Sequence, residues 1–190
     1  MSTTARINYC SACGAPLPHD APVECAACGR RHWCNPKPCA GALVVSAGRL
    51  LLVRRAHDPW RGSWDLPGGF CAVDEHPSET AVREVLEETG LAIEITGLLG
   101  VWRDDYPSVR SSEPTEVTLN LYYHAVPLAG SAVPADPAEV SEVGWFRPVE
   151  LPRELAFPGH IPRVLDAWRE AVRCGRVMTP LPDRPRRRSD

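Results

Sequence analysis

Three acidic side chains crowd the segment "REVLEETG" at residues 83–90: Glu84, Glu87 and Glu88. If this segment is helical, with about 100° per residue, the three carboxylates fall within one arc of roughly 100°. Like charges three or four positions apart on a helix repel each other by about 0.2–0.5 kcal/mol per pair. Carboxylates are also the hard oxygen donors that Mg²⁺ and Mn²⁺ prefer. The spacing therefore indicates either a solvated acidic face or a site for divalent cations.

Two neighbouring features favour the cation site. The segment "PGGF" at residues 67–70 precedes the helix and can form a tight loop whose carbonyl groups turn toward the acidic face. Arg83 lies about 40° from Glu87 around a helix axis, so its guanidinium can orient that carboxylate through two hydrogen bonds. We therefore expect a metal site built from this loop and the helix that follows it.

Four cysteines form a second group with ligand spacing. The segments "CSACG" (10–14) and "CAACG" (25–29) each place two thiols on one tight turn. Two such turns complete a closed tetrahedral Zn²⁺ site, so this zinc is expected to be structural. It would stabilise a segment that is too short to form a core of its own. The expected ligands are Cys10, Cys13, Cys25 and Cys28.

The remaining cysteines have other expected roles. His32 and Cys34 lie close to the second motif and rank below the four cysteines as zinc ligands. A redox pair is the alternative interpretation of a C-x-x-C motif, but two copies of a redox pair are unexpected. Cys39, Cys71 and Cys174 lie in or beside apolar segments, and we expect them to be buried thiols.

The elements that would position these groups follow from the hydrophobic pattern. Residues 40–45 and 49–55 are apolar runs around "SAG" and predict a buried hairpin, while residues 58–70 predict a loop. A helix over 77–89 would begin at Pro77, carry Glu79 in its first turn and stop at Gly90. Further strands are expected at residues 91–102, 115–126 and 143–146.

A second helix is expected over residues 162–175, with Gly175 as its stop. One face of this helix is apolar and should pack on the sheet. The residues of that face are Ile161, Val164, Leu165, Trp168 and Val172.

The acidic helix and the loop before it match a longer pattern, G-x5-E-x7-R-E-U-x-E-E-x-G-U, in which U is a bulky aliphatic residue. The fixed positions are Gly69, Glu75, Arg83, Glu84, Glu87, Glu88 and Gly90, and Val85 and Leu91 fill the aliphatic positions. In this pattern the chain resembles the Nudix hydrolases. The resemblance extends over residues 38–170 through "NPKPCAGALVV", "WDLPGGF", "GWF" and "LAFPGH", which look like the bacterial members that carry an N-terminal zinc ribbon.

The resemblance implies an α/β fold: an α/β/α sandwich around a mixed sheet, preceded by a small zinc ribbon. It implies an enzyme that cleaves a pyrophosphate bond in a nucleoside diphosphate linked to another moiety. Glu84, Glu87 and Glu88, with the carbonyl of Gly69, would hold Mg²⁺ or Mn²⁺, while Glu75 and Arg83 would brace the loop and helix. The base that activates water varies in the family, and the candidates are Glu87, Glu139 and Glu142.

The substrate is less well defined. The layout is similar to that of NADH pyrophosphatases, but their S-Q-P-W-P-F-P-x-S array is absent here. Tyr106 and Pro107 both lie where the family carries substrate markers, so they do not choose between ADP-ribose and a dinucleotide. Candidates for stacking on a base are Trp60, Trp64, Trp102, Tyr106 and Phe157, and candidates for phosphate contacts are Arg54, Arg55, Arg61 and Arg103.

Composition limits the cellular setting and the partners. A net charge of −3 in 190 residues argues against nucleic acid and anionic membranes as partners. No apolar run approaches the ~20 residues of a membrane span, and no signal peptide is recognised, so a cytoplasmic protein is expected. The expected partner is a small-molecule nucleotide substrate, and a homodimer is left open. A non-catalytic nucleotide sensor, with the zinc ribbon as its partner-binding part, is the alternative.

The motifs and the composition together predict that the chain is organised in three parts. Residues 1–35 would form the zinc ribbon and residues 36–176 the Nudix domain. Residues 177–190 are rich in proline and arginine and predict a disordered basic tail.

Overall fold

The computed structural model describes residues 7–18, 22–106 and 116–174. Three features of the sequence prediction lie outside these ranges: the basic tail at 177–190, the helix stop at Gly175 and the substrate marker Pro107.

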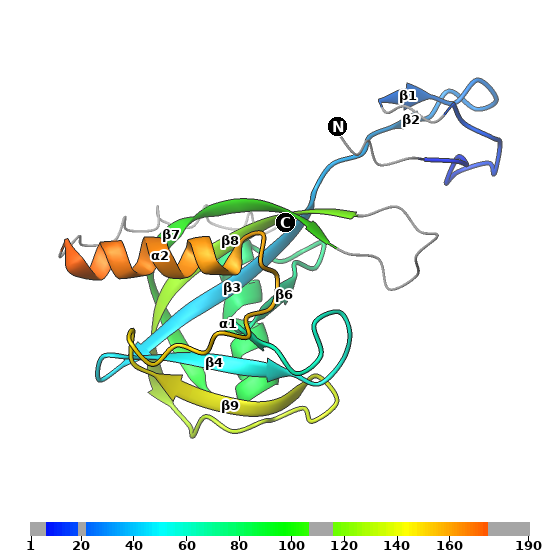
Figure 1. Cartoon of the computed structure of the whole chain (residues 1–190). Coiled ribbons are helices and arrows are strands. Elements are labelled where there is room, and N and C mark those ends of the chain that lie inside the picture. Colours follow the sequence, from blue (N-terminus) through cyan, green and yellow to red (C-terminus); the bar gives the residue numbers. More distant parts are fainter. Residues whose placement is uncertain (1–6, 19–21, 107–115, 175–190) are drawn as a thin grey trace, which may run out of the picture.

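A mixed sheet of seven strands forms the body of the molecule (Figure 1). Its main order is β5-β4-β3-β8-β7, with β6 beside β3 and β9 beside β4. The pairing of β3 with β8 is parallel, and the other pairings are antiparallel. The strands are β3 (Lys37–Ser46), β4 (Arg49–Arg55), β5 (Trp64–Asp65), β6 (Gly68–Phe70), β7 (Ala92–Tyr106), β8 (Glu116–Ala129) and β9 (Val140–Phe146).

The central strand β3 is buried on both faces, because the two helices cover opposite sides of the sheet (Figure 1). Ala42 and Val44 join the apolar cluster under α1 (Pro77–Thr89). Leu43 joins the cluster under α2 (Ile161–Arg173). This alternation is the period of two expected of a strand between two layers. The predicted α/β/α sandwich around a mixed sheet is therefore confirmed.

The predicted hairpin and its turn are also confirmed. Strands β3 and β4 pair antiparallel through Val45 with Leu50 and Ser46 with Arg49. Ala47 and Gly48 form the turn with φ of 47° and 73°, which are the positive angles of a two-residue hairpin turn.

Helix α1 has the boundaries that its sequence signals predict. Pro77 occupies the start, His76 and Glu79 form a reciprocal capping box, and Gly90 ends the helix with φ of 67°. Leu86 is apolar but does not belong to the buried face, because the residue is 49% exposed. The buried arc instead runs through Ala81, Val85 and Glu88, which turns one carboxylate inward.

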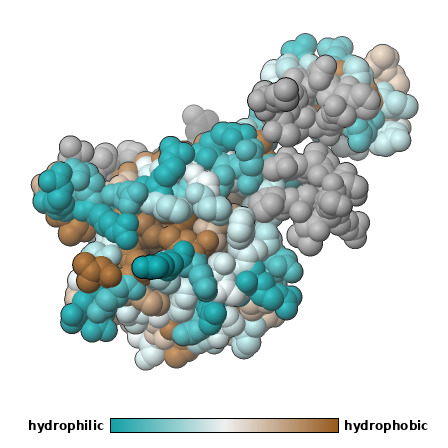
Figure 2. All heavy atoms as spheres, viewed as in Figure 1, coloured by the Kyte–Doolittle hydropathy of each residue, from teal (hydrophilic) through white to brown (hydrophobic). Residues whose placement is uncertain are grey.

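Helix α2 also lies where it was predicted, and its apolar side packs on the sheet. Apolar atoms gather between α2 and β4 on this face of the molecule (Figure 2). Val172 is an exception to the predicted face: it is exposed and lies in the last turn of α2, beyond the buried residues of that helix. Neither helix in the described part of the chain is long and apolar enough to cross a bilayer.

The prediction of a continuous loop over residues 58–70 is wrong in part, because β5 and β6 form within it. Strand β6 pairs with β3 through Gly68 opposite Gly41 and Gly69 opposite Ala40. A side chain at Gly68 would lie 2.6 Å from the carbonyl oxygen of Ala40, so only glycine permits this approach. The glycines that suggested a loop therefore allow a close strand pairing.

The N-terminal residues form a separate small unit beyond one end of β3 (Figure 1). A two-residue ladder joins β1 (Val23–Glu24) to β2 (Arg31–His32). The apolar cluster of this unit consists of Cys10, Leu17 and Cys25, with Ile7, Ala15 and Val23 packed against it. None of these residues belongs to the two clusters of the sandwich.

Candidate functional site

Arg83 is the hub of the acidic helix. Its Nε lies 2.6 Å from Glu75, and its Nη1 lies 2.9 Å from Glu84 and 2.7 Å from Glu87. Hydrogen bonds from Arg83 and Thr80 lower the pKa of Glu75 to about 2. One guanidinium thus offsets the repulsion among the carboxylates. Through Glu75 it also holds the loop before the helix against α1.

Glu84 and Glu88 face inward from α1. Glu88 is 8% exposed and accepts a hydrogen bond of 3.1 Å from the backbone amide of Gly68. Burial raises the pKa of Glu88 well above its usual value, and the charges of Asp65 and Glu84 add to the effect. Burial also raises the pKa of Glu84, although Arg83 opposes that shift. Two carboxylates whose charge is disfavoured suit a cation between them.

Gly69 lies directly against Glu84. A Cβ atom at this position would collide with the carboxylate oxygens and would lie 2.6 Å from the carbon that bears them. The backbone of β6 can approach the acidic face this closely only because the residue has no side chain. The predicted proximity of "PGGF" to the acidic helix is therefore observed.

Glu87 differs from the other two glutamates. Its side chain is 56% exposed and turns to Arg83, and it does not line the cavity described below. Within the described ranges, the three carboxylates do not gather as closely as the cysteine ligands do. The structure thus brings Glu84 and Glu88 to the site and holds Glu87 at its outer edge.

A cavity of about 380 Å³ opens beside Glu84 and Glu88. Its wall is formed by β3, β6, α1, β7, β8, the ends of β4 and β5, and the segments before β9 and before α2. Glu139 lines it as well, and its backbone carbonyl accepts a hydrogen bond of 2.8 Å from the amide of Ala56. Glu142, the other candidate from that segment, pairs with Arg54 at 3.3 Å and is not among the lining residues.

The sequence interpretation missed three polar residues in this wall. His160 Nδ1 lies 2.6 Å from Asp104 Oδ2, and His160 Nε2 lies 2.9 Å from the hydroxyl of Tyr122. His160 and Tyr122 are buried, and all three residues line the cavity. They lie 56 and 38 residues apart, so no local motif connects them. The "LAFPGH" segment was the signal, because it ends at His160.

Only some of the predicted substrate contacts face the cavity. Tyr106 and Phe157 line it, whereas Trp64 packs on Phe146 and Trp102 packs on Tyr122. Trp60 is not among the lining residues.

Among the four arginines proposed for phosphate contacts, Arg55 lines the cavity and Arg54, Arg61 and Arg103 do not. The guanidinium of Arg55 lies 3.4 Å from Asp65 and 5.1 Å from the centre of the Phe157 ring. A fixed cation in a wall that also carries aromatic rings suits an anionic ligand with a flat ring.

The four predicted zinc ligands meet in the N-terminal unit. Their sulfur atoms all lie within 4.8 Å of one another. In the described part of the chain, no other set of three or more potential ligand side chains gathers so closely. Thiolates at this spacing suit a tetrahedral Zn²⁺ ion, with no position left open for a substrate. The set is Cys10, Cys13, Cys25 and Cys28.

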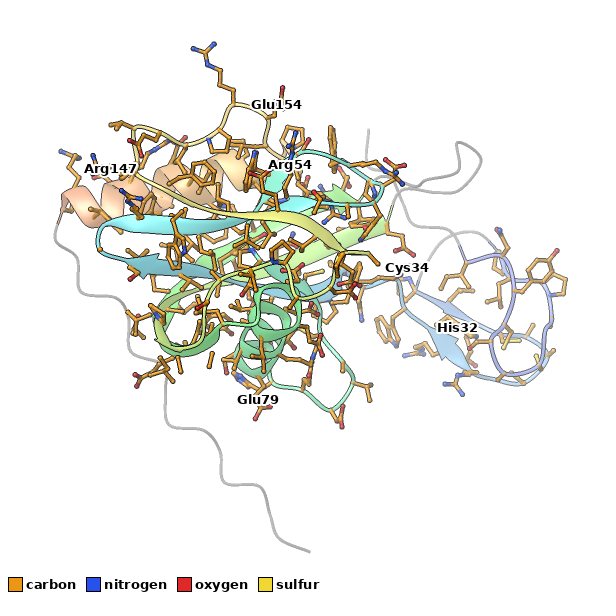
Figure 3. All side chains as sticks on the ribbon, turned by 90° about the horizontal axis from the view of Figure 1, so that it is seen from below. His32, Cys34, Arg54, Glu79, Arg147 and Glu154 are labelled. Carbon is orange, nitrogen blue, oxygen red and sulfur yellow. The ribbon has the colours of Figure 1, made fainter. Side chains whose placement is uncertain are left out.

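The surroundings of these cysteines favour a thiolate at Cys10. Burial acts to raise the pKa of this thiol, but hydrogen bonds from two backbone amides and from His32 lower it to about 5. The ring nitrogen Nε2 of His32 lies 3.2 Å from the sulfur of Cys10. His32 and Cys34 both belong to this unit (Figure 3), and His32 contacts a ligand without joining the ligand group.

The expectation of buried thiols is wrong for Cys174 and holds only in part for Cys39 and Cys71. Cys39 and Cys71 are half-buried, and Cys174 is exposed at the end of α2. Cys39 lies on the part of β3 that forms the cavity wall, so its side chain is partly exposed to the cavity. Cys174 caps the final turn, and this turn lies beyond the apolar cluster.

Comparisons with known proteins agree with this geometry. The NUDIX domain family matches residues 35–166. The chain is 36% identical over 128 residues to a MutT-like protein of Streptomyces ambofaciens, and the match covers 67% of this chain and 73% of that protein. It is 30% identical over 127 residues to an ADP-ribose pyrophosphatase of Methanocaldococcus jannaschii, covering 67% and 70%. A NUDIX hydrolase structure from Nitrosomonas europaea has a TM-score of 0.71 at 29% identity and covers 90% of this chain and 96% of that one. The chain therefore belongs to the NUDIX family.

Proposed function

We propose that this chain is a Mg²⁺-dependent pyrophosphohydrolase acting on a nucleoside diphosphate derivative, with ADP-ribose as the first compound to test. The observation that carries the proposal is the cavity bounded by Glu84, Glu88 and Gly69. A relative with 30% identity is named an ADP-ribose pyrophosphatase, which supports this substrate class. Arg55 and the aromatic side chains in the same wall suit a phosphate group and a base.

The residues present fit a divalent cation. Glu84 and Glu88 offer oxygen donors from α1, the backbone of Gly69 lies against Glu84 in the same cavity wall, and Glu87 lies at the edge beside Arg83. When bound, the ion neutralises phosphoryl oxygens and lowers the pKa of a bound water. Arg83 and Glu75 keep the loop and helix in register through their 2.6 Å ion pair.

Glu139 is the base that we favour for the attacking water. It lines the cavity, and its charge acts on Glu84 and Glu88, so it lies close to the proposed metal ligands. Glu87 is more exposed and is occupied by Arg83. A general base must reach the proton that it removes, and Glu139 meets that condition better than Glu87 does.

We further propose that residues 1–35 form a zinc ribbon with a structural Zn²⁺, and that residues 36–176 form the Nudix domain. The four gathered sulfur atoms support the ribbon. Because the ligands must stay reduced to bind zinc, a reducing compartment such as the cytoplasm suits the protein.

The test is hydrolysis of ADP-ribose to AMP and ribose 5-phosphate by the full chain with Mg²⁺. Glu84→Gln removes one proposed ligand and should lower kcat by about 10²–10³-fold while the thermal unfolding profile is retained. Glu94→Gln is the matched control, because Glu94 is exposed on β7 outside the cavity. Full activity of Glu84→Gln would contradict the proposed site. Tight nucleotide binding by the wild-type chain without hydrolysis of ADP-ribose, NADH, nucleotide sugars or dinucleoside polyphosphates would favour the sensor.

A further inference from the structure

Strand β8 contributes a row of polar side chains to the cavity that the proposed hydrolysis does not use. Thr118, Asn120 and Tyr122 alternate along the strand and therefore share one face. All three are buried, and all three line the cavity. Buried polar groups in a ligand cavity determine which partner groups a ligand must present.

At Asn120, both amide hydrogens are already used. Its Nδ2 donates to the carbonyl oxygen of Trp102 at 3.2 Å and to the hydroxyl of Thr118 at 2.9 Å. An amide nitrogen has two hydrogens, so these two bonds fill its donor capacity. The side-chain oxygen Oδ1 is therefore the group that Asn120 has available for a ligand, and it only accepts.

At Tyr122, a neutral His160 ring gives the chain of hydrogen bonds one direction. The carboxylate of Asp104 can only accept, so the 2.6 Å contact places a hydrogen on His160 Nδ1. In the neutral ring Nε2 is then an acceptor, and the hydroxyl of Tyr122 donates to it at 2.9 Å. Burial raises the pKa of Tyr122 well above its usual value, so the phenol keeps the proton that it donates. The lone pairs on the phenol oxygen are left for the cavity.

Neighbouring backbone segments fix the positions of the three hydrogen-bonded residues Asp104, His160 and Tyr122. The backbone of Gly159 lies so close to Asp104 that a Cβ atom would collide with the carboxylate. The segment before α2 is joined to β5 by two hydrogen bonds of 2.8 Å, from Trp64 to Glu154 and from Ala156 to Trp64. Fixed positions for Asp104 and His160 give Tyr122 a preset hydrogen-bond direction.

Aromatic rings form the adjoining wall. The ring of Tyr106 lies 5.7 Å from that of Phe70 and 5.7 Å from that of Phe157, and Phe157 lies 5.6 Å from the ring of His160. All four rings line the cavity. Rings of this kind favour a flat heteroaromatic group over a sugar, because the faces can stack.

We propose that the acceptors of Asn120 and Tyr122 select a nucleobase that carries an exocyclic amino group. An amino group offers hydrogens to the oxygens of the cavity floor, whereas a base without it leaves those buried oxygens unpaired. Asp104 and His160 act as positioning residues, since they fix the direction of the Tyr122 hydroxyl. The inference rests on the proposed nucleotide substrate and specifies its base.

The test compares nucleotides that differ only by an amino group: AMP against purine riboside 5′-monophosphate, and GMP against IMP. Their dissociation constants for the full chain are measured by calorimetry without divalent cations. At least one amino compound should bind about tenfold more tightly than its partner, which is the loss expected when a buried acceptor is left unpaired. Tyr122→Phe should reduce that ratio to below about threefold.

Two further variants separate hydrogen bonding from packing. Asp104→Asn can donate to His160 Nδ1, which moves the ring hydrogen to Nε2 and turns the Tyr122 hydroxyl toward the ligand as a donor. The amino preference should therefore fall in Asp104→Asn as well. Tyr123→Phe is the control, because Tyr123 lies on the same strand but packs in the cluster under α1. Its ratio should equal that of the wild type.

Equal affinities within each pair, a preference that survives Tyr122→Phe, or failure of all four nucleotides to bind at millimolar concentration would each overturn the inference. The proposed hydrolysis is judged separately with Glu84→Gln. That variant should lose hydrolysis and keep the amino preference, because Glu84 does not contact Asn120 or Tyr122 in the hydrogen-bond network. A wild-type chain with the preference but no hydrolysis would sink the proposed function alone.

Discussion

At the level of single residues, Glu88 is notable because an acidic side chain is buried. The residue is 8% exposed, and its carboxylate accepts a hydrogen bond from the backbone amide of Gly68. Its raised pKa means that ionisation of Glu88 destabilises the folded, metal-free chain. Asp65 shares this environment, since burial raises its pKa as well. The acidic site therefore stores unfavourable charge that a bound cation would relieve.

The pH dependence of Glu88→Gln measures this effect. Because the folded pKa lies above the unfolded value, the contribution of Glu88 is fully present below about pH 4.5 and is lost as pH rises through the raised pKa. Relative to the wild type, the variant should therefore gain stability as pH rises from 4.5 to 8 in a chelator. Urea unfolding at each pH gives the difference. A constant difference across that range would contradict the buried charge, and Mg²⁺ should stabilise the wild type more than the variant.

At the level of elements, strand β6 and helix α1 can approach each other closely because Gly69 has no side chain. Gly69→Ala would place a methyl group against the flexible end of Glu84 and displace its carboxylate. We expect kcat for ADP-ribose to fall by about 10²-fold with less than about 1 kcal/mol lost from the free energy of unfolding.

Gly48→Ala is the opposite case and serves as the control. Gly48 lies in the β3–β4 turn with φ of 73°, where an alanine costs about 1–2 kcal/mol, and it lies outside the cavity. Its activity should be unchanged and its stability reduced. If both variants lost only stability, the proposed role of Gly69 would be wrong.

The sequence predicts those elements whose signals are local. Pro77, Glu79 and Gly90 fix the ends of α1 within a few residues, so its boundaries follow from the chain itself. The pairing of β6 with β3 does not follow, because glycines in a strand carry the same local signal as a loop.

In the site, too, the sequence predicts contacts between residues close in the chain but not contacts between residues far apart in it. Arg83 and its glutamate partners lie within one helix and the loop before it, and the sequence predicts their proximity. The contact of His160 with Asp104 and Tyr122 depends on β7, β8 and the approach to α2 meeting in space. The parallel register of β3 with β8 also decides which face of β8 meets the cavity, and hydrophobic alternation does not specify that partner.

At the level of the whole molecule, the N-terminal unit and the sandwich have separate apolar clusters. The small cluster around Cys10, Leu17 and Cys25 is too limited to stabilise its residues without a metal. The sandwich has two clusters of its own, one under each helix. Stability of the two parts should therefore respond differently to removal of zinc.

Zinc content and proteolysis test this independence. We expect one Zn²⁺ per chain after gel filtration, and none in Cys25→Ser, whereas Cys174→Ser should keep its zinc because Cys174 lies outside the ligand group. After chelation, protease should cut within the N-terminal unit and leave residues 37–106 and 116–174 protected, because the sandwich clusters share no residue with the cluster of that unit. Mass spectrometry of the fragments locates the cuts. Equal cutting of both parts would mean that the sandwich depends on the metal, and an uncut N-terminal unit without zinc would show that this unit is held together by other means.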